Sequence, residues 1–181
     1  YIWDLPRFNV PSSLLSAVVN GWEFGGVYER STGTPFTPLL GGDPLGLNSN
    51  DPFSYPDRIT GPGCGSAVNP GSPNYIKLQC FAFPSPATRL GSTARNSLIG
   101  PGLSNLDFAL YKNIPVRRVS ENFNIQFRAE AFNVLNHTNF ASPINNSTLF
   151  DQSGTPIDGA GLVDATSTTS RQLQFSLKLV W

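Results

Sequence analysis

The sequence predicts an all-β fold of antiparallel amphipathic strands, and three observations support this prediction. First, 17 Gly and 16 Pro among 181 residues favour turns, while 12% aromatic residues need burial and disfavour disorder. Second, apolar and polar residues alternate with a period of two in several segments, as in strands with one apolar face. Third, the connections between these segments are very unequal in length. This composition excludes an α-helical bundle.

Five segments show the alternation. We expect strands at residues 1–5, about 17–32, 104–113, about 121–136 and 171–181. The last segment is the most regular, because every second residue from position 173 onward is apolar. These apolar side chains are Leu173, Phe175, Leu177, Leu179 and Trp181.

The turn between the third and fourth segments permits a prediction of strand register. A hairpin centred between residues 117 and 118 pairs positions that sum to about 235. Both faces agree with this register, because apolar residues meet on one face and opposite charges meet on the other. The predicted pairs are Leu110–Ile125, Phe108–Phe127, Asp107–Arg128 and Asn105–Glu130.

Short and long connections alternate along the chain. Residues 6–16 and 114–121 form short connections, whereas residues 33–103 and 137–170 form connections of about 71 and about 34 residues. Short turns at one end of a sheet and long loops at the other are typical of a transmembrane β-barrel. The two clearest strands reach the roughly 9 to 11 residues that such a strand needs.

In a barrel, the polar face of the sheet would line the lumen and the apolar face would contact lipid. The expected lumen-facing charges, which most simply form a solvated ladder, are Glu23, Glu29, Asp107, Arg128, Glu130 and Lys178. The aromatic residues expected at the membrane interfaces are Trp3, Trp22, Tyr28 and Trp181. The alternative for this apolar face is the core of an ordinary β-sandwich.

The sequence offers little chemistry for catalysis or for cofactor binding. The single histidine, His137, has no reliably placed nucleophile or carboxylate, so we expect a loop residue that hydrogen-bonds to backbone. One histidine and two separated cysteines have no zinc-site spacing. Zero net charge and the lack of a Lys/Arg cluster beyond residues 117–118 exclude a nucleic-acid partner. We therefore expect no enzyme activity, metal or cofactor.

Cys64 and Cys80 lie 16 positions apart in the longest connection. We expect them to form a disulfide, which requires an oxidising compartment such as the periplasm or the cell surface. The alternative is a pair of free buried thiols.

Four stretches of the chain resemble the TonB-dependent outer-membrane receptors, in particular the Oar-like branch. Each stretch is modest alone, but their order is fairly specific, and together with the C-terminal strand they span nearly the whole chain. They are Gly21-Trp22 with Gly33-Thr34-Pro35-Phe36-Thr37, Arg95-Asn96-Ser97-Leu98 with Gly100-Pro101-Gly102, Asp107-Phe108-Ala109-Leu110-Tyr111-Lys112, and Arg128-Ala129-Glu130-Ala131-Phe132-Asn133-Val134-Leu135-Asn136-His137.

The resemblance implies an arrangement in the Gram-negative outer membrane. The alternating strand that ends in Trp181 looks like the signal read by the barrel-assembly machinery, which places the C-terminus in the periplasm and the long loops outside the cell. Residues 1–181 would then be the C-terminal portion of a barrel, with about five of its roughly twenty-two strands. The chain contains no Met, so we expect a piece of a longer gene product that lacks the plug domain.

The implied function is uptake of an unknown nutrient across the outer membrane. The implied partners are outer-membrane lipid, the barrel-assembly machinery, the cargo, and the TonB energy-coupling complex acting through the missing plug. One alternative is a secreted soluble β-sandwich that binds carbohydrate through the loop aromatics Phe53, Tyr55 and Tyr75. Another is a small complete barrel acting as a porin or an enzyme, which would need at least about eight strands.

Overall fold

The computed structural model describes residues 1–46, 54–86, 89–117, 121 and 123–181. These residues form two compact units. The sheet unit comprises Tyr1–Arg30, Ser104–Thr138 and Thr168–Trp181, and the loop unit comprises Ser31–Leu103 and Asn139–Ser167. The prediction of an all-β, antiparallel fold is confirmed.

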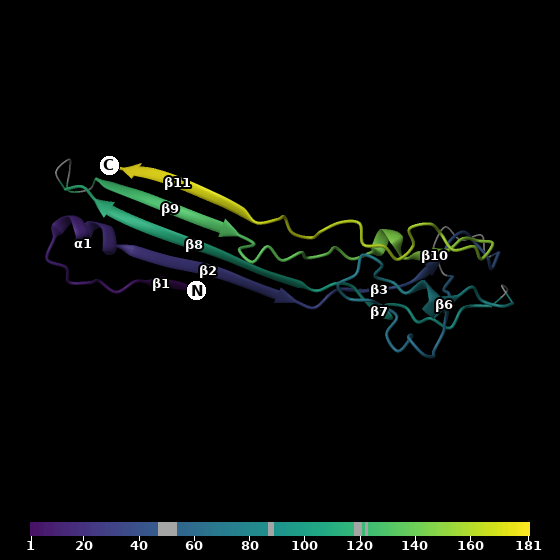
Figure 1. Ribbon diagram of the computed structural model, residues 1–181. Coiled ribbons are helices and arrows are strands. Elements are labelled where there is room, and N and C mark those ends of the chain that lie inside the picture. The colour runs from purple at the N-terminus through teal and green to yellow at the C-terminus, as the bar shows by residue number, and fades with distance from the viewer. Residues whose placement is uncertain (47–53, 87–88, 118–120, 122) are drawn as a thin grey trace. The chain divides into compact units, whose positions relative to one another are not determined.

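The sheet unit is a five-stranded sheet within the described residues, with the strand order β1-β2-β8-β9-β11 (Figure 1). Each strand overlaps one of the five segments expected from the sequence, and only β8 extends beyond its expected bounds of 104–113. Their bounds are β1 Ile2–Asp4, β2 Trp22–Ser31, β8 Leu103–Pro115, β9 Asn124–Phe132 and β11 Gln172–Val180. Because neighbouring strands run in opposite directions, the connections β2–β8 and β9–β11 leave the same end of the sheet. We call the opposite end the short-turn end.

The predicted register between β8 and β9 is wrong by four positions. Leu110 lies opposite Ala129 rather than Ile125, and Phe108 lies opposite Ala131. The hairpin extends further than expected, since β8 continues to Pro115 and the next backbone N–H, of Val116, donates to the Phe123 carbonyl over 2.9 Å. A slip by an even number of residues keeps every side chain on its expected face.

One face of the sheet is apolar across all five strands. Leu177 lies opposite Phe127, and the Phe175 ring stacks on that of Phe127 at 6.4 Å between centroids. Toward the other edge of the sheet, the Phe24 ring contacts the rings of Phe108 and Trp3 at 5.5 and 5.8 Å. These side chains are nevertheless solvent-accessible, and Leu177 is 66% exposed. Soluble proteins rarely expose a continuous apolar surface of this kind, so the face is unlike the surface of a soluble protein.

A short helix, α1 (Ser13–Val19), precedes β2 and was not expected from the sequence. Residues 17–19, which we expected to begin a strand, form its last turn. The Ser12 hydroxyl accepts a hydrogen bond from Leu15 N–H at the start of the helix, as an N-cap residue does. At its other end, the Asn20 side chain pairs with the backbone N–H and carbonyl of Phe8.

The two long connections fold together into the loop unit. In its described part, short strands pair across and within the connections, flanked by the 3-10 turns Leu78–Cys80 and Ile144–Asn146. The pairs are β3 (Pro35–Phe36) with β7 (Leu98–Ile99), β4 (Leu39–Leu40) with β10 (Thr148–Phe150), and β5 (Asp57–Arg58) with β6 (Phe81–Ala82).

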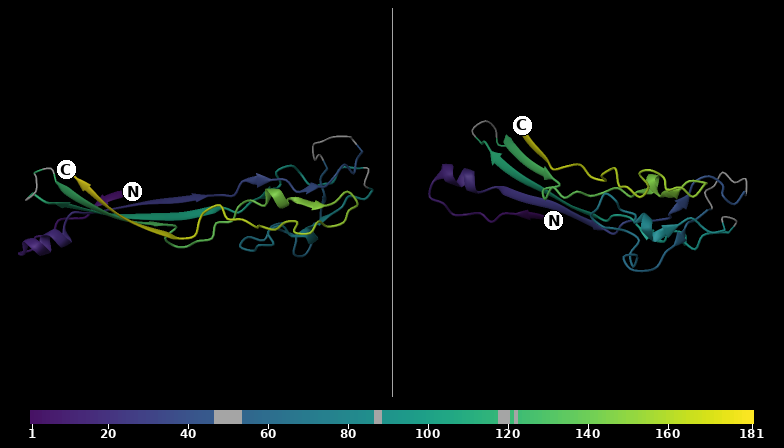
Figure 2. Two further views of the ribbon diagram at one scale, coloured as in Figure 1. Left: turned by 90° about the horizontal axis from the view of Figure 1, so that it is seen from above. Right: turned by 45° about the vertical axis from the view of Figure 1, so that its right-hand side comes forward.

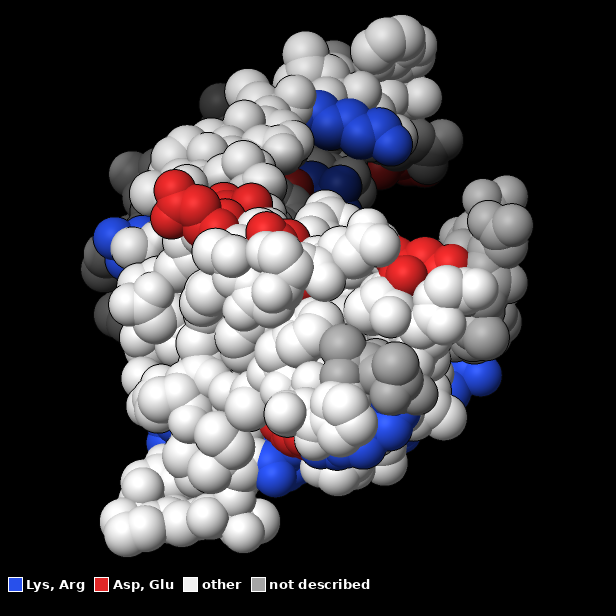
Figure 3. All heavy atoms as spheres, turned by 90° about the vertical axis from the view of Figure 1, so that its right-hand side faces the viewer, with Lys and Arg blue, Asp and Glu red and all other residues white. Residues whose placement is uncertain are grey.

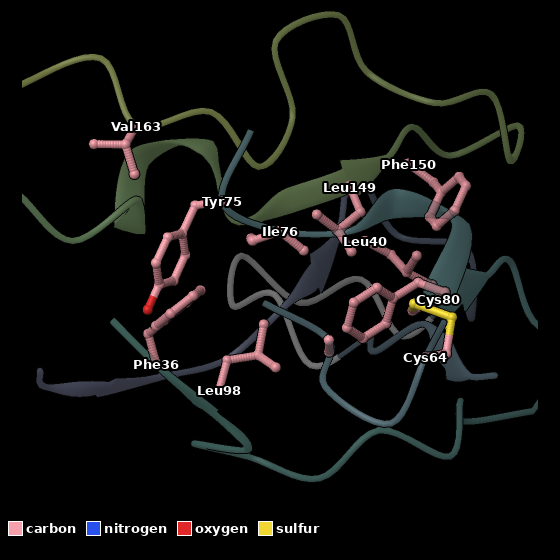
Figure 4. Packing of buried hydrophobic residues seen from close by; sticks show 12 residues of the cluster. Phe36, Leu40, Cys64, Tyr75, Ile76, Cys80, Leu98, Leu149, Phe150 and Val163 are labelled. Atoms are coloured by element: carbon pink, nitrogen blue, oxygen red, sulfur yellow. A yellow bond between two sulfur atoms is a disulfide. The ribbon is translucent and has the colours of Figure 1, made fainter. Parts of the chain in front are cut away.

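A hydrophobic core holds the loop unit together (Figure 4). Leu40 and Ile76 from the first connection pack with Leu149 and Phe150 from the second, and all four are buried. Leu39 N–H donates to the carbonyl of Ser147, so the backbone also joins the two connections. The sequence alone predicted two long loops and not this shared core.

The glycine-containing stretches 33–37 and 100–102 lie against each other inside the loop unit. A Cβ atom placed on Gly33 would lie 1.7 Å from the Gly100 carbonyl oxygen, which is impossible for any side chain. Gly100 N–H in turn donates to the Thr34 carbonyl over 2.9 Å. These glycines are required because two backbone segments approach each other closely.

Candidate functional site

The polar face of the sheet is the first candidate surface. In the register, Arg128 lies opposite Ser176, Glu130 opposite Gln174, and Lys178 opposite Gln126. Alternation along each strand places all six expected charges on this face. This face of the sheet is therefore polar and carries both signs of charge.

The predicted ion pair between Asp107 and Arg128 is wrong. Arg128 lies opposite Tyr111, and its guanidinium carbon is 4.6 Å from the centroid of the Tyr111 ring, a cation–π contact. Asp107 instead accepts hydrogen bonds from the backbone N–H of Asn133 at 2.8 Å and from the Asn105 amide at 2.9 Å. The four-position slip of the hairpin is the cause of this change of partners.

Asn133 ties together the strand ends at which the second long connection begins and returns. It is 4% exposed and has a positive φ of 47°, a conformation that Asn tolerates better than most residues. Its amide donates to the carbonyls of His137 and Thr169, and its Oδ1 accepts from the His137 N–H. His137 is thus held through its backbone, while sequence reasoning missed Asn133.

A shallow hollow of about 340 Å³ lies beside Asn133 and Thr169. Carboxylate, amide and hydroxyl groups form part of its wall. Among the described residues, the Oδ1 of Asn105 is buried without a hydrogen-bond partner. Such groups can bind hydroxyl-bearing or amide-bearing solutes, but they include no nucleophile with a base. The lining residues are Asn105, Asp107, Phe132, Asn133, Thr168, Thr169 and Gln172.

The loop unit contains a disulfide between Cys64 and Cys80. Arg58, which sequence reasoning did not single out, binds the backbone of both disulfide-bonded cysteines. Its guanidinium donates to the carbonyls of Cys64 at 2.6 Å, Cys80 at 2.9 Å and Ile59 at 2.7 Å, and it lies 5.3 Å from the centroid of the Phe81 ring. Only the folded chain brings these carbonyls together, so no local pattern could have identified Arg58.

An ion pair closes another part of the loop unit. Arg89 binds the Asp57 carboxylate through two nitrogen atoms, at 2.9 and 2.5 Å, and Ser92 N–H donates to the same carboxylate at 2.9 Å. The hydrogen bond from Arg89 holds the pKa of Asp57 below its ordinary value of 3.8. The pair is structural in character, since no reactive group adjoins it in the described contacts.

The two expected loop aromatics that the structure describes, Tyr55 and Tyr75, are partly or fully buried. Tyr75 is buried in the core, and its hydroxyl donates to the Ile99 carbonyl over 2.8 Å. Burial raises the pKa of this phenol. Tyr55 is partly buried, and Phe53 lies outside the described residues. The surface that faces the viewer in Figure 3 is mostly uncharged, with separate acidic and basic patches.

The described residues bring together no group of three or more His, Cys, Asp or Glu side chains suited to a metal ion. In the same part of the chain, no helix combines the length and apolarity needed to cross a membrane.

Residues 1–174 match the model of an outer membrane beta barrel domain family. The match covers most of the chain, so the chain belongs to this family and is an outer-membrane protein. No curated protein and no solved structure matches it. The family explains the uncovered apolar face of the sheet, because a transmembrane barrel turns that face to lipid.

Proposed function

We propose that this outer-membrane protein is a TonB-dependent receptor of the Oar-like branch, and that residues 1–181 are the C-terminal portion of its barrel. Its function would be energised uptake of a nutrient across the outer membrane. The observation that carries the proposal is the combination of an amphipathic sheet with two long connections that leave one end and fold around a common core. Large ordered loops on a rigid barrel suit capture of a cargo.

The proposal includes an orientation. The C-terminus and the short-turn end would face the periplasm, and the loop unit would face the outside. The disulfide between Cys64 and Cys80 is compatible with the periplasm and with the cell surface, because disulfides persist in both of these oxidising compartments. The polar face of the sheet, with Asp107, Arg128 and Glu130, would line the lumen.

The proposed partners follow from this role. They are outer-membrane lipid, the barrel-assembly machinery, the cargo, and the TonB energy-coupling complex acting through a plug domain elsewhere in the protein. We assign no nucleic-acid partner, no cofactor and no catalytic activity. The alternative of a secreted carbohydrate-binding sandwich is less well supported, because the apolar face has no second sheet over it in the described chain and Tyr75 is a core residue.

The test is genetic and uses the full-length gene in its own organism. A strain lacking the gene and a strain lacking TonB are grown on a panel of single nutrients and iron sources. We expect both strains to lose uptake of the same compound, and reintroduced receptor to restore it only where TonB is present. Uptake that depends on the gene but continues without TonB would contradict the proposal.

A further inference from the structure

Helix α1 has its apolar side turned away from the protein. At 100° per residue, Leu14, Leu15 and Val18 fall on one side of the helix, and they are 79%, 54% and 65% exposed. The opposite side, with Ser13, Ser16 and Ala17, lines a hollow of about 1040 Å³ at the short-turn end of the sheet. A surface helix of a water-soluble protein instead turns its apolar side toward the protein and its polar side toward solvent.

The last turn of α1 is fastened to the apolar face of the sheet. Lys112 lies opposite Phe127, so its side chain leaves the sheet on the apolar face. Its ammonium group donates to the carbonyl of Val18 at 3.0 Å and also to the carbonyl of Asn20, and it lies 4.9 Å from the centroid of the Trp22 ring. The Trp22 indole N–H donates to the same Val18 carbonyl over 2.8 Å.

This contact explains how a charged lysine can lie on the apolar face. A lysine that faces lipid without a partner is destabilising, yet Lys112 is only 4% exposed and its ammonium group is hydrogen-bonded. The free carbonyls at the C-terminus of a helix carry partial negative charge and favour a cation. The carbonyl of Val18 thus binds two side chains of the apolar face, one from β2 and one from β8.

We propose that α1 is an interfacial membrane helix that inserts Leu14, Leu15 and Val18 among phospholipid acyl chains at the short-turn end of the sheet. The occupant is lipid because the exposed side of α1 continues the face that the barrel family turns to the bilayer. Lys112 and Trp22 are the tether that holds the helix at that level (Figure 2 shows α1 at the start of β2). Insertion of α1 into lipid does not depend on the proposed uptake.

The experiment places nitroxide labels on the full-length protein in vesicles of phosphatidylethanolamine and phosphatidylglycerol. Labels at L14C and V18C are compared with S13C on the opposite side of α1. Two reference labels are L177C on the apolar face and K178C on the polar face. Without reductant, the Cys64–Cys80 disulfide does not react with the label. Collision with oxygen reports lipid, and collision with a water-soluble nickel chelate reports water.

We expect the labels at positions 14 and 18 to behave like the label at position 177, with oxygen collisions exceeding nickel collisions. The label at position 13 should show a lower ratio of oxygen to nickel collisions than these labels. Nickel collisions in excess at positions 14 and 18 would place α1 in water and overturn the proposal. Protection of both labels from both reagents would mean that protein covers the helix, which also overturns it.

A second variant tests the tether. Lys112→Met keeps an unbranched side chain suited to the apolar face, so the strand should still insert. We expect the oxygen preference at position 14 to shift toward the value at position 13, while the label at position 177 is unchanged. An unchanged value at position 14 would show that Lys112 does not position the helix.

Discussion

Arg128 and Tyr111 face each other across β9 and β8, with the guanidinium carbon 4.6 Å from the ring centroid. The contact lies on the polar face of the sheet, where Arg128 has no carboxylate opposite it in either neighbouring strand. The partner directly opposite Arg128 on β8 is therefore an aromatic ring. This relationship follows from the position of the hairpin turn, which lies further along the chain than the sequence suggested.

Replacing Tyr111 tests the cation–π contact. Tyr111→Ala should lower the free energy of unfolding by about 0.5–1 kcal/mol, because Arg128 then loses the ring at an exposed site. Tyr111→Phe keeps the ring and should have almost no effect. Urea unfolding of the full-length protein in lipid vesicles measures both variants, and equal losses would show that the ring is not what Arg128 requires.

Removal of the disulfide should weaken the loop unit and leave the sheet intact. The Cys64→Ser, Cys80→Ser double variant frees a loop of 16 positions, which corresponds to about 3 kcal/mol of lost constraint on the unfolded loop. We expect faster proteolysis between residues 54 and 86, with the barrel still heat-modifiable on gels. Gln79→Ala, an exposed position in the same loop, is the control and should be cleaved at the parental rate.

The Asp57–Arg89 pair predicts a loss of stability in acid. Since Arg89 lowers the pKa of Asp57 in the folded state, the pair stabilises the loop unit above the ordinary pKa of 3.8, and this contribution disappears as pH falls through the lowered value. Arg89→Gln should therefore be more protease-sensitive than the parent at pH 7 but equally sensitive in strong acid. Asp158→Asn removes an exposed carboxylate of the same unit and should leave the difference unchanged.

Trp181 tests the proposed assembly signal. Trp181→Ser should reduce the amount of folded, heat-modifiable protein in the outer membrane, because the alternating strand would lose the aromatic residue that the resemblance assigns to the signal. Lys178→Gln, on the polar face of the same strand, should assemble normally. Normal amounts of the Trp181 variant would rule out this signal.

Surface labelling tests the proposed orientation. In intact cells, a membrane-impermeant maleimide should react with L90C in the loop unit, where Leu90 is exposed. R117C, at the short-turn end, should react only after the outer membrane is permeabilised. The reverse pattern would place the loop unit in the periplasm and invert the proposed topology.

The strands and their faces could be predicted from the sequence because alternation is a local property. In β11, Leu173, Phe175, Leu177 and Leu179 identify both the strand and its apolar side without any partner. The same local patterns indicated an outer-membrane barrel, because strands with one apolar face and connections of alternating length are typical of that architecture. Even the error in register left the faces unchanged, since the slip was even.

Contacts between distant segments could not be predicted in this way. Whether Arg128 meets Asp107 or Tyr111 depends on where the turn lies, and the residues flanking the turn permit more than one centre. Arg58 binds carbonyl oxygens of Cys64 and Cys80, and a carbonyl is present at every residue, so the sequence contains no signal for that site.

The sequence by itself determined the all-β class, the approximate positions of the five strands and which side of each strand is apolar. Tertiary structure alone decided the register of the hairpin, the common core of the two long connections and the attachment of α1 to Lys112. The physical reason is the separation along the chain between the groups that decide each feature. Alternation is set by neighbouring residues, whereas pairing, packing and the satisfaction of a buried charge depend on groups that lie as far apart in the chain as Val18 and Lys112.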